Sequence, residues 1–156
     1  MKLYLLRHGH ARSALEAGVS GDGERPLSEM GREDVRRMVR FLAEKGGRPV
    51  LILHSPLRRA AQTAAEAAEI LKPAQGLEAF GPLSNKISGE ELCACLLRRA
   101  EGLAEVLAVG HQPQLGELAE HLSGTSFSLR PGGAICLEVA GDGAASLLWA
   151  CNPEEL

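Results

Sequence analysis

The feature that most constrains this chain is a short apolar run near its start that gives way at once to polar residues. Residues 3–6 are apolar, and Arg7, His8 and Gly9 follow directly. Four to eight apolar residues bounded by a turn signal predict a buried strand. Open α/β sheets bind their ligands beyond the carboxyl ends of such strands. Because arginine binds phosphate or carboxylate groups and histidine is a candidate nucleophile or base, the pattern predicts a catalytic site at this strand end.

Three later segments place further basic residues where they could meet this strand end. Arg25 stands just before a predicted helix, and the segment 55–63 brings Arg58 and Arg59 directly after a second apolar run. His111 ends a third apolar run. An isolated Arg-His pair is more often an ordinary surface pair. The repeated placement at the ends of apolar runs instead favours one site assembled from several strand ends.

The motifs around these residues resemble those of the histidine phosphatase superfamily, which has the phosphoglycerate mutase-like fold. They are the Arg-His-Gly strand end at 7–9, the Ser-Pro-Leu-x-Arg-Ala-x-Gln-Thr segment at 55–63 and the Gly-His pair at 110–111, in the order that the superfamily has them. The short chain and the Arg-Pro-Leu-Ser-x-x-Gly segment at 25–31 narrow the resemblance to phosphohistidine phosphatases of the SixA type. The resemblance extends over residues 2–125.

The resemblance implies a metal-independent reaction that needs no cofactor. The nucleophile would be His8, which attacks phosphorus to give a phosphohistidine intermediate that water then hydrolyses. A phosphoryl group in transfer spreads negative charge over its oxygens, so fixed cations and hydrogen-bond donors stabilise it. We expect catalytic roles for Arg7, His8, Arg59 and His111, and substrate-binding roles for Arg25, Gly9, Ser13 and Gln112.

The family pattern assigns its invariant arginine to Arg59 and leaves Arg58 at a variable position. Ser55 is a favourable N-cap and Pro56 suits the first position of a helix, so we expect a helix over 56–71. Arg59 would then lie in the first helical turns, close to free N–H groups that favour phosphate. We expect Arg58 to be a solvated surface cation.

The clustered arginines also bear on the protonation of the nucleophile. A histidine must be neutral to attack phosphorus, and its unperturbed pKa is about 6.5. Nearby guanidinium groups disfavour a second positive charge, so we expect them to lower the pKa of His8. The same cations favour a bound phosphate dianion.

The segment after the short strand expected at 77–80 lacks a group that ester-cleaving members of the superfamily usually have. They carry a glutamate there that protonates the leaving alkoxide, whereas residues 79–85 contain no carboxylate. Glu78 precedes this segment, and Glu90 and Glu91 begin the next predicted helix. The absence suits phosphohistidine, because imidazole is a far better leaving group than an alkoxide.

We therefore expect a phosphatase that acts on phosphohistidine in a protein, such as a phosphotransfer domain or a phosphocarrier protein. Two alternatives stay open at this point. The substrate could be a small phosphate monoester, with Glu78, Glu90 or Glu91 as the acid, or the chain could bind phosphate without turning it over. A pure binding module would not need the nucleophile His8, which argues against the last alternative.

The composition excludes several other classes of partner. The formal net charge of -3 gives no electrostatic reason to expect nucleic acid or an anionic membrane. No apolar stretch approaches the ~20 residues of a membrane span, and the start of the chain does not have the pattern of a signal peptide. The four cysteines lack metal-binding or redox spacing and are expected to be reduced thiols. We expect a cytoplasmic protein.

Alternating apolar runs and amphipathic segments predict an α/β fold in one domain, residues 1–156. We expect three layers, α/β/α, with a mostly parallel central sheet and an antiparallel hairpin at the C-terminal end. The predicted strands are 2–6, 49–54, 105–109, 134–139 and 146–150, with a short extra strand at 77–80. The predicted helices are 28–44, 56–71, 89–101 and 112–122. Residues 11–24 form one long loop, interpreted equally as a lid or recognition loop or as a disordered connector.

Overall fold

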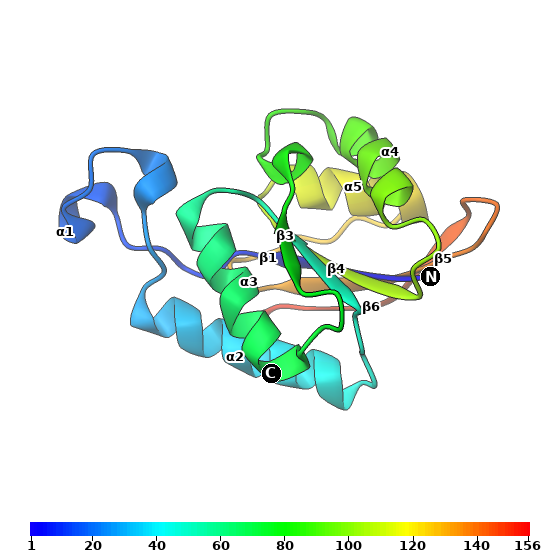
Figure 1. The fold of residues 1–156 in the computed structure, drawn as a ribbon, viewed down its shortest axis with the longest axis horizontal. Coiled ribbons are helices and arrows are strands. Elements are labelled where there is room, and N and C mark those ends of the chain that lie inside the picture. The colour runs from blue at the N-terminus through cyan, green and yellow to red at the C-terminus, as the bar shows by residue number, and fades with distance from the viewer.

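The computed structural model describes residues 1–156 and has a central sheet between two layers of helices (Figure 1). The strands are β1 (Lys2–Arg7), β2 (Leu51–His54), β3 (Leu77–Ala79), β4 (Glu105–Gly110), β5 (Ala134–Val139) and β6 (Ala145–Cys151). They form one six-stranded sheet in the order β3-β2-β4-β1-β5-β6. The first four strands pair in parallel, whereas β5 is antiparallel to both of its neighbours. The predicted fold class is therefore confirmed, and so is the short strand expected at 77–80.

Helices cover both faces of this sheet. One face packs against α2 (Glu29–Glu44) and α3 (Arg58–Leu71), and the other against α4 (Gly89–Arg99) and α5 (Gln114–Ser123). A shorter helix, α1 (Ala14–Ala17), lies at the left edge of Figure 1. Three short 3-10 helices complete the chain: η1 (Asp22–Glu24), η2 (Gly81–Leu83) and η3 (Pro153–Glu155).

The central strands contribute to two cores because successive side chains of a strand point to opposite faces. Leu3 and Leu5 of β1 pack in the core under α4 and α5, whereas Tyr4 and Leu6 pack in the core under α2 and α3. All four side chains are at most 2% exposed. The continuous apolar run that predicted β1 thus reflects a strand covered on both faces. The assignment of residues 1–156 to a single domain stays a prediction.

The parallel register brings three strand ends to one edge of the sheet. Arg7 at the end of β1 pairs with Gly110 of β4, and His54 at the end of β2 pairs with Val109. The backbone N–H of His8 donates to the carbonyl of Gly110 at 3.0 Å. The residues that follow β1, β2 and β4 are therefore neighbours in space, as the sequence predicted.

Gly9 allows the turn after β1 to pack directly on the start of α2. A side-chain carbon at this position would lie 2.7 Å from the carbonyl oxygen of Gly31 and 2.9 Å from the side chain of Val35. The backbone N–H of Gly9 donates to the hydroxyl of Thr63 in α3 at 3.1 Å. Gly9 is thus required for close packing of the turn that carries His8.

Several predicted boundaries are wrong by one or two residues. Helix α3 begins at Arg58 rather than at residue 56, because Leu57 is extended and occupies the N-cap position. The Ser55 hydroxyl accepts from the N–H of Leu57, before the helix, and also contacts His111. Helix α5 begins at Gln114 rather than at residue 112, and α4 ends at Arg99 rather than at residue 101. The loop 11–24 contains α1 and η1, so its interpretation as a disordered connector is wrong.

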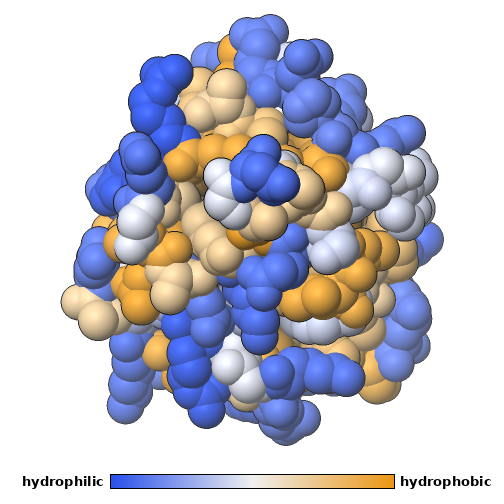
Figure 2. Space-filling model, turned by 90° about the vertical axis from the view of Figure 1, so that its right-hand side faces the viewer, coloured by the Kyte–Doolittle hydropathy of each residue, from blue (hydrophilic) through white to orange (hydrophobic).

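Strand β1 starts at the end of the molecule opposite to the end where β1, β2 and β4 finish. Figure 2 looks at that starting end and shows apolar patches interrupted by charged side chains.

Each helix of the structure is too short or too polar for a membrane-spanning segment.

Candidate active site

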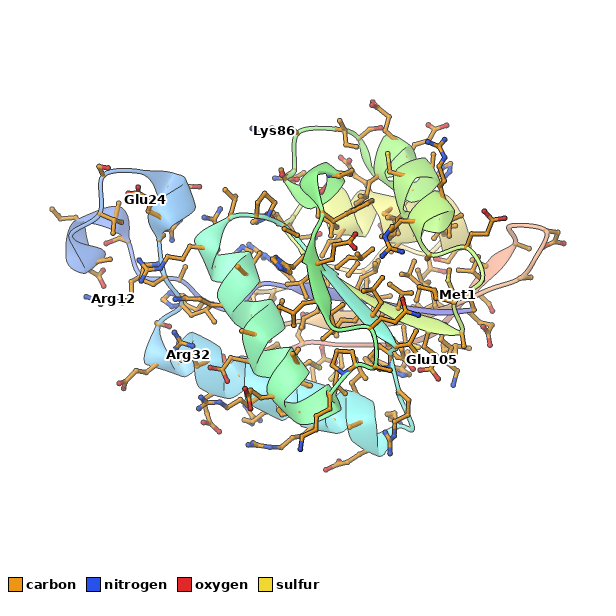
Figure 3. All side chains as sticks on the ribbon, in the orientation of Figure 1. Met1, Arg12, Glu24, Arg32, Lys86 and Glu105 are labelled. Carbon is orange, nitrogen blue, oxygen red and sulfur yellow. The ribbon has the colours of Figure 1, made fainter.

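A pocket of about 400 Å³ opens at the carboxyl ends of the parallel strands. The 11–25 segment, marked by the labelled Arg12 and Glu24 in Figure 3, lies at the same end of the molecule, opposite to Met1 and Glu105. Asp22 is the only acidic residue that lines the pocket. The basic side chains that line it are Arg7, His8, His10, Arg25, Arg59 and His111.

His8 follows β1, and the backbone orients its ring. Its Nδ1 lies 2.8 Å from the carbonyl oxygen of Gly9. A carbonyl oxygen can only accept, so Nδ1 carries the proton and Nε2 keeps the lone pair that a nucleophile needs.

The pKa of His8 is lowered to about 3, chiefly by burial. The Gly9 carbonyl opposes this lowering of the pKa, while the positive charges of Arg59 and Arg7, and of His111 when it is protonated, add to it. The predicted direction of the shift is confirmed, but burial rather than the arginines is its main cause. His8 is therefore neutral at pH 7.

Arg7 occupies the last position of β1 and is anchored to a neighbouring loop. Its Nη1 donates to the carbonyl of Leu129 at 2.9 Å. Its Nε is buried and has no hydrogen-bond partner within the protein. A guanidinium that is fixed at one nitrogen and unpartnered at another is prepared to receive an anionic oxygen.

Arg59 and Arg25 meet at the carboxylate of Asp22. Nη2 of Arg59 donates to Oδ2 of Asp22 at 3.1 Å, and Nη1 of Arg25 donates to Oδ1 at 3.0 Å. Nη1 of Arg59 also donates to the backbone carbonyl of Asp22 at 2.9 Å. The hydrogen bond from Arg25 and the charge of Arg59 hold the pKa of Asp22 below its usual range, against the effect of burial. The pocket therefore contains an ionised carboxylate between two of its cations.

His111 follows β4, and its ring centroid lies 5.0 Å from that of His8. Its Nε2 is 2.7 Å from the Oγ of Ser55, and its Nδ1 is buried without a hydrogen-bond partner in the protein. Its pKa is lowered to about 4, mainly by burial and then by the charge of Arg59. His111 is thus a neutral imidazole at pH 7 and not a cation.

The structure brings most, but not all, of the predicted residues together. Gln112 lines the pocket, although its Oε1 accepts from the backbone N–H of Gly116 at 2.7 Å. Gly9 does not line the pocket, because it is buried against the start of α2. Ser13 does not line it either, because its hydroxyl caps α1 by accepting from the N–H of Glu16. Arg58 is exposed and donates to the carbonyl of Glu24 outside the pocket.

None of the glutamates considered as a general acid lines the pocket. Both oxygens of Glu78 are held by Arg99, each at 2.9 Å. Glu90 and Glu91 are exposed in the first turn of α4, where Glu91 accepts from the hydroxyl of Ser88.

The sequence did not indicate that Asp22 lines this pocket or that Ser55 contacts His111. Asp22 precedes Arg25 by three residues, a spacing that favours an ion pair and was the available signal. Ser55 fits the pattern of an N-cap, which concealed its contact with His111. Asn85 adopts a left-handed conformation with φ 68 and lines the pocket beside the start of α5. Its Nδ2 donates to the carbonyl of Gln112 at 3.0 Å.

No group of three or more His, Cys, Asp or Glu side chains is arranged to hold a metal ion. The cysteines are free, and Cys93, Cys136 and Cys151 are buried. Three arginine side chains line the pocket, and their planar forks suit tetrahedral oxyanions.

Comparisons with known proteins agree with this arrangement. The model of the histidine phosphatase superfamily (branch 1) matches residues 3–80. An uncharacterised protein of Picosynechococcus sp. is 37% identical, over 88% of this chain and 84% of the relative. The phosphohistidine phosphatase SixA of Escherichia coli is 28% identical, over 98% of this chain and 94% of the relative. The solved structure of the protein histidine phosphatase SixA with tungstate superposes with a TM-score of 0.89 at 26% identity, over 98% of this chain and 97% of that one. The chain belongs to the histidine phosphatase superfamily, branch 1, and is of the SixA type.

Proposed function

We propose that this phosphatase hydrolyses phosphohistidine on a protein substrate through a covalent phosphohistidine at Nε2 of His8. The observation that carries the proposal is that the pocket has no carboxylic acid able to protonate a leaving alkoxide. Asp22 is its one acidic residue, and its carboxylate is ionised between Arg25 and Arg59. Phosphohistidine needs no such acid, because its leaving group is an imidazole.

The proposed reaction has two in-line steps at His8. Nε2 attacks phosphorus while the P–N bond of the substrate breaks, and the bonding electron pair leaves on the substrate imidazole, which takes a proton from water. A water molecule then attacks the phosphoryl group on His8 and loses a proton to the solvent. The second P–N bond breaks, its electron pair returns to Nε2, and phosphate is released. The neutral ring and its Nδ1–H···O=C contact with Gly9 support Nε2 as the attacking atom.

The remaining basic side chains would stabilise the charge on the transferring group. Arg7, Arg59 and Arg25 would bind the phosphoryl oxygens through their guanidinium N–H groups, and His111 would donate one further hydrogen bond. Gln112 borders the same space and would contact the bound group.

A protein substrate is supported by the SixA relatives, one of which is named a phosphohistidine phosphatase and another a protein histidine phosphatase. The partner would be a phosphotransfer domain or a phosphocarrier protein, and the location would then be the cytoplasm. The pocket is also reached from exposed segments, since His10, Asp22 and Asn85 on its lining are exposed.

The test is a comparison of turnover on a phosphohistidine protein with a series of aryl and alkyl phosphate monoesters. We expect phosphohistidine to be hydrolysed fastest, aryl esters next and alkyl esters slowest, because rates without acid assistance depend steeply on the leaving group. Glu78→Gln, Glu90→Gln and Glu91→Gln should each leave phosphohistidine turnover within about twofold, as surface substitutions away from the pocket do.

Two outcomes would contradict this proposal. Efficient alkyl phosphatase activity that is lost in one of the three glutamate variants would identify a general acid and a small-molecule substrate. Phosphate binding without turnover of any compound in the series would indicate a binding module.

A further inference from the structure

Two buried side chains from neighbouring strand ends, Ser55 after β2 and His111 after β4, are hydrogen-bonded to each other. Oγ of Ser55 lies 2.7 Å from Nε2 of His111. Ser55 is 0% exposed and His111 is 3% exposed, so this contact is shielded from water. The hydrogen bond at one nitrogen of an imidazole decides which nitrogen carries the proton.

The other partners of Ser55 decide the direction of this hydrogen bond. Its oxygen already accepts from the backbone N–H of Leu57 at 3.2 Å. Its hydroxyl hydrogen has one acceptor within hydrogen-bond distance, Nε2 of His111. A buried hydroxyl that donated to nothing would carry an unfavourable desolvation free energy. Ser55 therefore donates to Nε2, and a neutral His111 carries its own proton on Nδ1.

We infer that Ser55 is a positioning residue that holds His111 as the Nδ1–H tautomer, so that a neutral imidazole donates a hydrogen bond to the transferring phosphoryl group. Nδ1 is buried and has no hydrogen-bond partner in the protein, while the ring lines the pocket beside His8. Only the claim that Nδ1–H of His111 donates to a phosphoryl group rests on the proposed function. The tautomer is a property of the free protein.

The surroundings of His111 explain why a fixed tautomer matters. The charged groups that face its ring are Arg59, Asp22 and Arg7. Burial is the main cause that lowers the pKa of His111 to about 4; the two arginines add to this lowering, and Asp22 opposes it. Protonation therefore cannot provide the donor at pH 7. In the other tautomer, Nδ1 would present a lone pair to an anionic oxygen, and the interaction would be repulsive.

The first test reads the tautomer directly. Long-range ¹H–¹⁵N correlation spectra of ¹⁵N-histidine-labelled protein at pH 7, with and without inorganic phosphate, distinguish a protonated Nδ1 from a protonated Nε2. We expect His111 to be the Nδ1–H tautomer in both samples and to become a mixture of tautomers in Ser55→Ala. Ser28→Ala is the matched control, because Ser28 makes a similar contact to Nδ1 of His10 at 2.9 Å. It should leave the His111 tautomer unchanged. An Nε2–H tautomer in the wild-type protein would overturn the inference, even if Ser55→Ala does not fold.

The second test measures turnover of an aryl phosphate. We expect Ser55→Ala to lower kcat about tenfold, with a smaller change in KM. This effect is smaller than the decrease in kcat that follows removal of a whole transition-state donor. Ser55→Thr keeps the hydroxyl and should recover most of kcat. The deficit of Ser55→Ala should shrink as the pH is lowered from 7 to 4, near the pKa of about 4 of His111, since an imidazolium donates from both nitrogens. A deficit that is equal at both pH values would show a merely structural role for Ser55. If aryl phosphates are hydrolysed and a phosphohistidine protein is not, the proposed substrate fails while this inference stands.

Discussion

The two sides of the pocket are held in place by different kinds of contact. On the strand-end side, the backbone N–H groups of His8 and Ser55 donate to the carbonyls of β4 at 3.0 Å, and the ring of His111 is buried. On the other side, the 11–25 segment projects from the body of the molecule (Figure 1), and neither α1 nor η1 contains a buried residue.

The 11–25 segment instead contacts the arginines of the pocket. The carboxylate of Asp22 accepts hydrogen bonds from Arg25 and Arg59. Outside the pocket, the carbonyl of Glu24 accepts a hydrogen bond from Arg58 at 3.1 Å. The strand-end side is therefore preorganised by the sheet, whereas the segment side is held by the same cations that must receive a phosphoryl group. Changes on the first side should affect the chemical step most, and changes on the second should affect anion binding.

The largest effect should come from the strand-end side. His8→Ala removes the attacking Nε2, and we expect turnover of phosphohistidine or aryl phosphate to fall at least about a thousandfold. The fold should be retained, because His8 follows the last residue of β1 and is absent from both cores. Circular dichroism checks the fold, and acid-labile phosphate should be trapped at His8 in the wild-type protein. Substantial turnover by folded His8→Ala would contradict the covalent mechanism.

Arg59 stands between the two sides, so its substitution compares them directly. An ammonium group cannot reproduce two parallel N–H donors, so Arg59→Lys should lower kcat/KM about a hundredfold although the charge is kept. Arg58→Lys is the matched control. We expect it to change kcat/KM by no more than about twofold, because Arg58 is exposed outside the pocket. A reversed pair of results would mean that Arg58 is the phosphate-binding arginine.

The same contrast explains how much the sequence could predict. The strand-end residues were identifiable because buried parallel strands are continuous apolar runs, and their polar ends converge at one edge of the sheet. The contacts of Asp22 with Arg59 and of Ser55 with His111 join residues 37 and 56 positions apart. No local periodicity encodes such pairs, so Asp22 was missed and Ser55 was interpreted as a helix cap.

The buried histidines should also make the free energy of unfolding depend on pH. Because the pKa of His8 is about 3 in the folded protein and about 6.5 in an unfolded chain, the unfolded state binds more protons between these values. Stability should therefore fall as pH decreases below about 6.5, by up to about 1.4 kcal/mol per pH unit for each such histidine.

Urea unfolding of His8→Gln between pH 6.5 and pH 5 measures the contribution of this side chain. We expect the variant to show a shallower pH dependence than the wild-type protein by up to one proton. His121→Gln is the control, since His121 is exposed near the end of α5. An unchanged slope in His8→Gln would show that His8 titrates alike in the folded and unfolded states.

The smallest effect should come from the segment side, through Asp22. Asp22→Asn removes a negative charge from between Arg25 and Arg59, so inorganic phosphate should inhibit the variant at a lower concentration. The Asp22 side chain is 66% exposed, and exposed ion pairs contribute about 0.2–1 kcal/mol, which limits the gain to about fivefold. The contact of Arg59 with the backbone carbonyl of Asp22 survives the change and keeps the guanidinium in place. Glu16→Gln removes one charge from an exposed site on α1 and should leave the inhibition constant unchanged. Weaker inhibition in Asp22→Asn alone would mean that Asp22 orients the arginines, and the 11–25 segment would then be as preorganised as the strand ends.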